Sequence, residues 1–63
     1  MQYRGYKIRQ DPETYKVEII SLLGGNILYT ENPGHKLDDM QLKAIIGKYV
    51  AITMRKVYEK YEL

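Results

Sequence analysis

Apolar and polar residues alternate along the first third of the chain, as they do in strands that bury one face. The stretch from Gln2 to Gln10 follows this alternation and predicts one strand. Asp11-Pro12-Glu13-Thr14 then has the composition of a turn, and the alternation resumes from Tyr15 to Ile19. Together the two stretches predict a β-hairpin.

A four-residue loop would fix the register of this hairpin. It places Ile8 opposite Val17 and Lys7 opposite Glu18. Apolar residues then face each other and so do opposite charges, which favours this register.

A third strand is predicted from Asn26 to Glu31, after a tight Gly24-Gly25 turn. Before that turn, Ile20 and Leu22 have the opposite parity to Ile19, and two interpretations follow. In a regular strand they lie on the face away from the core, Ile20 opposite Tyr29 and Leu22 opposite Ile27, and form a second apolar patch. Alternatively, a β-bulge near Ile19-Ile20 returns them to a single core.

Exposed apolar patches usually mark interfaces, so the first interpretation also predicts a partner surface. Tyrosine suits such surfaces because it has a large apolar body and a polar tip. The candidate interface residues are Tyr3, Ile20, Leu22, Ile27 and Tyr29 in the strands and Tyr58 and Tyr61 near the C-terminus.

A helix is predicted from residue 38 to residue 46. Asp38 has the place of an N-cap, and Gln41 three residues later completes a capping box. Leu42, Ile45 and Ile46 then repeat at helical spacing and form one apolar stripe.

Gly47 follows this stripe and is typical of a helix C-cap. Residues 48–57 are rich in β-branched and aromatic residues and alternate as a strand does, so we expect a fourth strand there. The alternative is one long helix to the C-terminus. Its apolar residues would spread over more than half of the helix surface, so it would need a second partner to cover them.

The chain is therefore expected to be a single small α+β domain spanning residues 1–63. The preferred architecture is β-β-β-α-β, a small antiparallel sheet with one helix packed on one face; the alternative is a three-stranded sheet followed by one long C-terminal helix. The predicted core consists of Tyr6, Ile8, Val17, Ile19, Leu28, Leu42, Ile45, Ile46, Val50, Ile52 and Met54.

Size and composition point to association. A 63-residue chain buries too little surface to be more than marginally stable alone, and without cysteine it has no disulfides. We therefore expect a homodimer or a higher oligomer. Because the chain shows neither a membrane-spanning apolar run nor a signal peptide, we expect a cytoplasmic protein.

Candidate catalytic and metal-binding groups have simpler structural explanations. A helix cap beside a turn histidine accounts for His35, Asp38 and Asp39 without a metal. Ser21 has no histidine near it in sequence, and Gly24-Gly25 lacks the spacing of a phosphate-binding loop. We expect a protein that is not an enzyme and has no cofactor or metal.

Nucleic-acid binding is the alternative function. The net charge is only +2, but Arg4, Lys7, Arg9 and Lys16 all lie in the first hairpin. In the predicted register Arg9 faces Lys16, a like-charge pair that an anionic partner would relieve. Glu13 and Glu18 dilute this patch.

The segment from Leu42 to Thr53 resembles the helix and Gly-Lys-x-Val-x-Ile-Thr strand of small prophage proteins of the YonK type. This resemblance covers about a fifth of the chain and transfers no catalytic residue; the N-terminal hairpin has no counterpart in it. It implies a phage or mobile-element accessory protein that self-associates and binds or inhibits a host protein, in the cytoplasm of the host cell.

Overall fold

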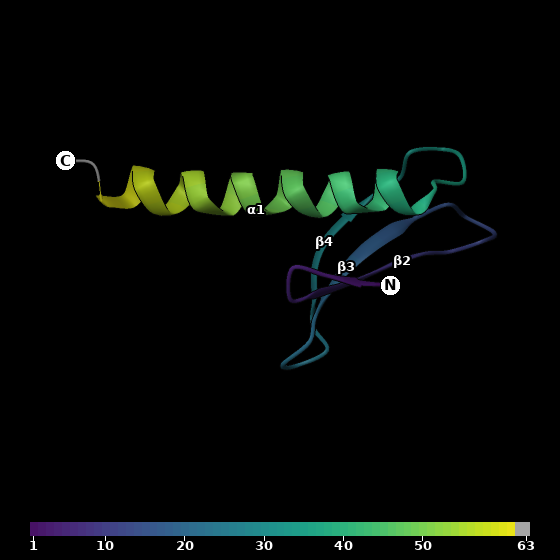
Figure 1. Cartoon of the computed structure of the whole chain (residues 1–63), viewed down its shortest axis with the longest axis horizontal. Coiled ribbons are helices and arrows are strands. Elements are labelled where there is room, and N and C mark those ends of the chain that lie inside the picture. Colours follow the sequence, from purple (N-terminus) through teal and green to yellow (C-terminus); the bar gives the residue numbers. More distant parts are fainter. Residues whose placement is uncertain (62–63) are drawn as a thin grey trace.

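The computed structural model describes the backbone of residues 1–61 and the side chains of residues 1–56. Four strands form one antiparallel sheet in the order β1-β2-β3-β4, and one helix follows them. The strands are β1 (Gln2–Tyr3), β2 (Tyr6–Gln10), β3 (Val17–Ser21) and β4 (Ile27–Glu31), and the helix is α1 (Asp39–Tyr61). Figure 1 shows α1 crossing one face of the twisted sheet and continuing beyond it. The α+β class with one helix on an antiparallel sheet is confirmed.

The first predicted strand is in fact two strands. A tight turn at Arg4 and Gly5 separates β1 from β2, and Tyr3 pairs with Tyr6 across it. Arg4 and Gly5 have φ values of 53° and 83°, the left-handed conformation that two-residue hairpin turns need. The prediction of one strand from Gln2 to Gln10 is therefore wrong; Gly5 was the signal of the break.

The hairpin of β2 and β3 is confirmed, but its register differs from the prediction. Ile8 lies opposite Ile19, and Arg9 opposite Glu18. The loop is two residues longer than predicted, because Tyr15 also adopts a left-handed conformation (φ 66°) and Lys16 precedes the strand. A shift of two residues changes every partner but leaves each side chain on its predicted face.

Between β3 and β4 the register shifts at Ile19-Ile20. Ile19 lies opposite Tyr29 and Ile20 opposite Ile27, so Leu28 has no partner and is the extra residue of a bulge in β4. The connection is also longer than a two-residue turn. The bulge interpretation was correct about the place of the irregularity, but Ile20 does not join the single core; it stays on the opposite face, beside Lys7 and Ile27.

The helix begins as predicted and does not end where predicted. Asp38 Oδ1 accepts the N–H of Gln41 at 2.8 Å, and Gln41 Oε1 accepts the N–H of Asp38 at 3.0 Å, so the capping box is formed. Gly47 lies inside α1, which runs through residues 48–57. The predicted fourth strand at 48–57 is wrong, and the alternative of one long C-terminal helix is correct.

The core lies between α1 and the sheet. Its buried residues are Ile8, Val17, Ile19, Leu42, Ile45 and Ile46, all of which were predicted. Tyr6 and Val50 pack against it as partly buried residues. Leu28, Ile52 and Met54 are exposed, so their assignment to the core is wrong. Leu28 is displaced by the bulge, and the other two lie on the part of α1 that has left the sheet (Figure 1).

Gln10 joins three segments at the start of α1. Its amide Nε2 donates to the carbonyl oxygens of Tyr15 and His35, at 3.0 and 2.8 Å, and its Oε1 accepts the N–H of Leu37 at 2.8 Å. One side chain of β2 therefore holds the loop before β3 and the segment that leads into the helix.

In residues 1–61 no helix has the length and apolar character needed to cross a membrane.

Candidate interaction surfaces

Three surfaces carry the residues that sequence analysis singled out. They are the sheet face that α1 covers, the opposite sheet face, and the part of α1 beyond the sheet. We call the second the far face, defined by Lys7, Arg9, Glu18, Ile20 and Ile27, and the third the overhang, defined as residues 51–61 of α1.

The covered face contains a cluster of tyrosines. Tyr49 of α1 meets Tyr6 edge to face at a centroid distance of 5.5 Å and Tyr29 in a tilted arrangement at 5.9 Å. Such ring pairs stabilise beyond the area that they bury. Tyr29 was predicted to lie on the exposed patch, and that placement is wrong: it packs against the core and its hydroxyl donates to Glu31 at 2.9 Å.

Tyr3 also belongs to the covered side. It packs against the core, and the Lys43 ammonium and the Arg4 guanidinium lie 5.5 and 5.8 Å from its ring centroid. Cations at this distance from an aromatic face are attracted to it. Tyr3 thus fixes the position of α1 beside β1 and is not part of the far face, contrary to prediction.

The side of α1 next to β4 carries an ion pair. Lys48 Nζ lies 3.6 Å from Glu31 Oε1. The Glu31 carboxylate, and secondarily the Tyr29 phenol, raise the pKa of Lys48 above its ordinary value of 10.5. Lys43 and Lys48 therefore hold α1 between the two edges of the sheet.

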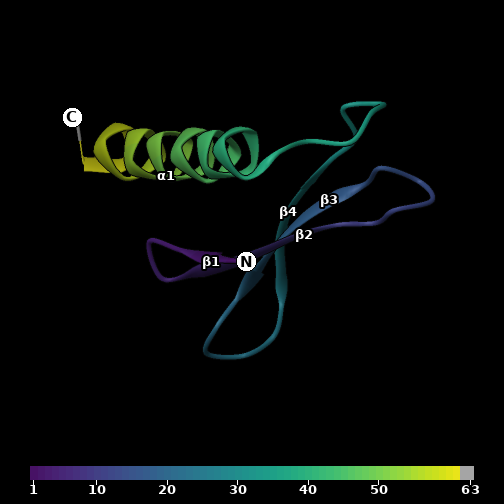
Figure 2. The ribbon, with the colours of Figure 1, turned by 45° about the vertical axis from the view of Figure 1, so that its right-hand side comes forward.

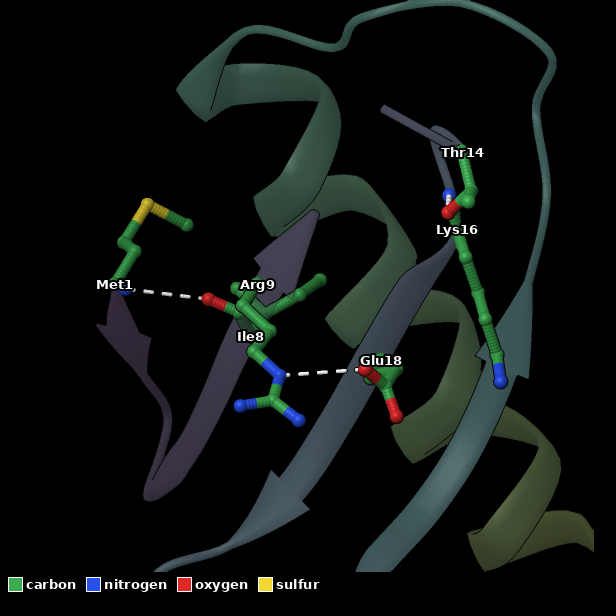
Figure 3. A network of polar contacts seen from close by, with 6 residues as sticks. All are labelled: Met1, Ile8, Arg9, Thr14, Lys16 and Glu18. Carbon is green, nitrogen blue, oxygen red and sulfur yellow. Dashed lines mark hydrogen bonds and ion pairs between the residues drawn. The ribbon is translucent and has the colours of Figure 1, made fainter. Parts of the chain in front are cut away.

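The far face combines an ion pair with apolar residues. Figure 3 views the sheet from this side, with α1 behind it, and shows Arg9 Nε reaching Glu18 Oε1 at 3.2 Å. Arg9 does not face Lys16, so the predicted like-charge pair is wrong. Ile20 is buried, with 9% of its surface exposed, whereas Ile27 opposite it is 53% exposed.

Of the predicted patch, Ile20 and Ile27 thus remain together on the far face, and Leu22 follows β3 in an exposed loop. Leu28 is also exposed, at the bulge in β4, although the sequence analysis assigned it to the core. Its signal would have been the parity break that Ile19 and Ile20 already showed.

Basic residues are dispersed around the first hairpins. Arg4 lies in the β1–β2 turn against Tyr3, whereas Lys7 and Arg9 belong to the far face. Lys16 precedes β3 and is exposed. The four candidates do not form one uninterrupted basic surface, since Glu18 stands in its middle.

The overhang lies outside the part of the fold in which α1 packs on the sheet. Figures 1 and 2 show α1 extending well beyond the strands, and all of residues 51–56 are exposed. Ile52 and Met54 are 40% and 51% exposed. Tyr58 and Tyr61 fall in the last turns of α1, and their side chains lie outside the described residues.

An open groove of about 610 Å³ lies near the start of α1. Ile8, Leu37 and Leu42 line it together with charged residues of both signs, including Arg9, Asp11 and Asp39. Backbone N–H groups of Glu13 and Thr14 donate to Asp11 and lower its pKa below its ordinary value of 3.8. These bonds shape a turn, and among residues 1–56 no three His, Cys, Asp or Glu side chains gather as metal ligands.

Comparison with protein-family models, curated proteins and solved structures gives no match to this chain.

Proposed function

We propose that this chain is a small, non-catalytic protein-interaction module that associates with copies of itself and binds another protein. The observation that carries the proposal is the overhang. It exposes Ile52 and Met54 on a helical segment for which the sheet provides no cover.

Helix energetics support this proposal. Most helix stability in proteins comes from the packing of an apolar face and less from intrinsic propensity. The overhang has eleven residues in the range 51–61 of α1 and includes the β-branched Ile52, Thr53 and Val57, which lower helix propensity. A partner that covers it would supply the packing that the sheet does not.

The far face is the second candidate contact. Ile27 is exposed opposite the buried Ile20, Leu28 is exposed at the adjoining bulge, and Leu22 is exposed in the loop that follows β3. Because this face is on the other side of the sheet from α1, one molecule can use the overhang for one partner and the far face for another. We assign the far face to a different protein. That this protein belongs to a bacterial host of a phage is what the YonK-type resemblance implies, and a pull-down from host lysate with Ile27→Glu as control tests it.

Nucleic-acid binding is a second candidate function, favoured by the common location of Lys7 and Arg9 on the far face. The ion pair of Arg9 with Glu18 weakens it, because it compensates one of these two charges. Titration with DNA and RNA at two salt concentrations tests this candidate, since phosphate contacts weaken steeply with salt. Weak binding that does not change with salt would reject it.

Sedimentation equilibrium tests self-association directly. At tens of micromolar, roughly the range of ordinary weak interfaces, the chain should be a dimer or larger. The double variant Ile52→Gln/Met54→Gln should be monomeric and keep its circular dichroism. Leu23→Gln, which removes a fully exposed apolar side chain from the loop after β3, should associate like the parent chain. A monomeric parent chain would contradict the proposal.

A further inference from the structure

The pairing of β2 with β1 covers only part of the outer edge of β2. The N–H of Ile8 donates to the Met1 carbonyl at 2.8 Å, and the Met1 nitrogen donates to the Ile8 carbonyl at 3.2 Å. Figure 3 shows Met1 at this place, with β2 continuing past it. Within residues 1–61, the last two residues of β2, Arg9 and Gln10, therefore have no strand on their outer side.

The main chain of Gln10 points to this open edge. Along an antiparallel strand the hydrogen-bonding direction alternates, so residues two apart point the same way. Ile8 points to β1, whereas Asp11, whose N–H donates to the Lys16 carbonyl at 2.9 Å, points to the other side. The N–H and C=O of Gln10 thus point outward, and no group among residues 1–56 bonds to either of them. An unpaired donor and acceptor of this kind are a template for a further strand.

The groove at the start of α1, of about 610 Å³, follows the same edge. Met1 and Gln10 line it from the sheet, and Leu37 and Leu42 line it from the segment that enters the helix and from its first turn. Extended peptides bind at such places in several recognition domains. Main-chain bonds to the strand edge then give affinity, and pockets for alternate side chains give specificity.

We propose that this groove binds an extended peptide segment of another protein as an added strand, in line with β1 and antiparallel to β2. One residue of the segment exchanges both main-chain hydrogen bonds with Gln10. The segment must end or turn away beside Met1, which occupies the next place along the edge. The inference goes beyond the proposed function, since it depends neither on self-association nor on the apolar residues of the far face.

The register determines which side chains the peptide needs. Paired residues project to the same face, so the residue opposite Gln10 points to the covered side, towards Leu37 and Leu42, and should be apolar. The next residue towards the carboxyl end lies opposite Arg9 on the other face. The ion pair of Arg9 with Glu18 uses Nε, and 58% of the Arg9 side chain is exposed, so its terminal nitrogens can bind a carboxylate there. The expected sequence is an apolar residue followed directly by an acidic one.

The length of the free edge determines the expected affinity. Pro12, two residues beyond Gln10, has no N–H, and the chain turns at Asp11, whose carboxylate accepts the N–H groups of Glu13 and Thr14. Only one residue of β2 therefore offers both a free donor and a free acceptor. Binding should be weak, with a Kd on the order of 1 mM.

NMR titration of the full chain with the peptide acetyl-Ser-Val-Ser-Val-Glu-amide tests the site. In the expected register its second valine lies opposite Gln10 and its glutamate opposite Arg9. The Gln10 amide proton should exchange with solvent several-fold more slowly when the peptide is bound. Methylation of the nitrogen of the second valine, which removes the donor to the Gln10 carbonyl, should weaken binding by about tenfold.

Two protein variants test the register. Arg9→Gln and Lys7→Gln each remove one positive charge from the same face of β2. Arg9→Gln should weaken binding of this peptide by about two- to fivefold, as the loss of an exposed ion pair does. Lys7→Gln should leave it unchanged, because Gln2 of β1 already lies opposite Lys7 on the outer side. Equal effects of the two variants would overturn the proposed site.

Unchanged exchange of the Gln10 amide at several millimolar peptide would also overturn the proposal, as would shifts confined to the far face or the overhang. Exchange that slows with rising protein concentration in the absence of peptide would assign the edge to a second copy of the chain and overturn the peptide site. The sedimentation test with Ile52→Gln/Met54→Gln concerns a different surface, so failure of one proposal is distinguishable from failure of the other.

Discussion

The two halves of α1 have the same backbone conformation and opposite environments. In residues 39–50, every apolar side chain that points to the sheet is buried or partly buried, and cation–π and ion-pair contacts hold the helix at both sheet edges. In residues 51–56, the side chains are all exposed. The first half is helical because it packs, whereas the second half continues a helix that the first half has begun. Elongation of an existing helix needs no new nucleus, so the overhang can remain helical with little packing of its own.

The largest expected effect is the loss of stability when a buried side chain of the first half of α1 is removed. Ile46→Ala removes a side chain with no exposed surface and should lower the free energy of unfolding by about 2–5 kcal/mol. A domain of this size rarely has more than about 3–5 kcal/mol, so this variant should be largely unfolded by circular dichroism.

The matched change in the overhang is Ile52→Ala. Its side chain is 40% exposed, whereas Ile46 is fully buried, and urea unfolding of the monomer should show a much smaller change, within about 0.5 kcal/mol. Equal losses in the two variants would mean that the overhang is packed in solution.

A smaller effect is expected at the start of the packed half. Asp38→Ala removes the cap of α1 and should cost about 1 kcal/mol in urea unfolding. Asp38→Asn keeps an acceptor for the Gln41 N–H and should cost much less. If both variants were as stable as the parent chain, the start of α1 would be held by Gln10 and not by its cap.

The smallest effect concerns the ion pair at the end of the packed half. Because the pKa of Lys48 is raised in the fold, its stabilising contribution is present below about pH 10.5 and is lost as the pH rises through the higher folded value. Glu31→Gln should return the pKa of Lys48 towards 10.5 and remove this loss of stability at high pH. NMR titration of the Lys48 side chain checks the shift, and an unchanged pKa in the variant would show that Tyr29 causes it.

The packed half and the core were predictable because several local signals agreed. The capping box, the stripe of Leu42, Ile45 and Ile46 and the alternation around Ile8 all point to the same buried face. The two-residue error in the β2–β3 register did not disturb this result, since face depends on parity and not on the partner.

The overhang was mispredicted because its local signals conflict. Gly47 resembles a C-cap, and Val50, Ile52 and Met54 alternate as strand residues do, yet the helix passes through all of them. β-branched residues have only a weak preference against helix, and a helix already anchored by a cap and a core overrides it. The left-handed residues Arg4 and Tyr15 were missed for a different reason: neither is a residue type that favours positive φ, and only Gly5, next to Arg4, marked one of the two turns.

The tyrosine cluster makes helix docking visible by optical spectroscopy. Tyr6, Tyr29 and Tyr49 come from two strands and the helix, and their rings meet only when α1 lies on the sheet. Since the chain contains no tryptophan or phenylalanine, its near-ultraviolet circular dichroism arises from tyrosine alone. Loss of that signal with the far-ultraviolet helix signal retained would reveal a state in which α1 has detached from the sheet while remaining coiled.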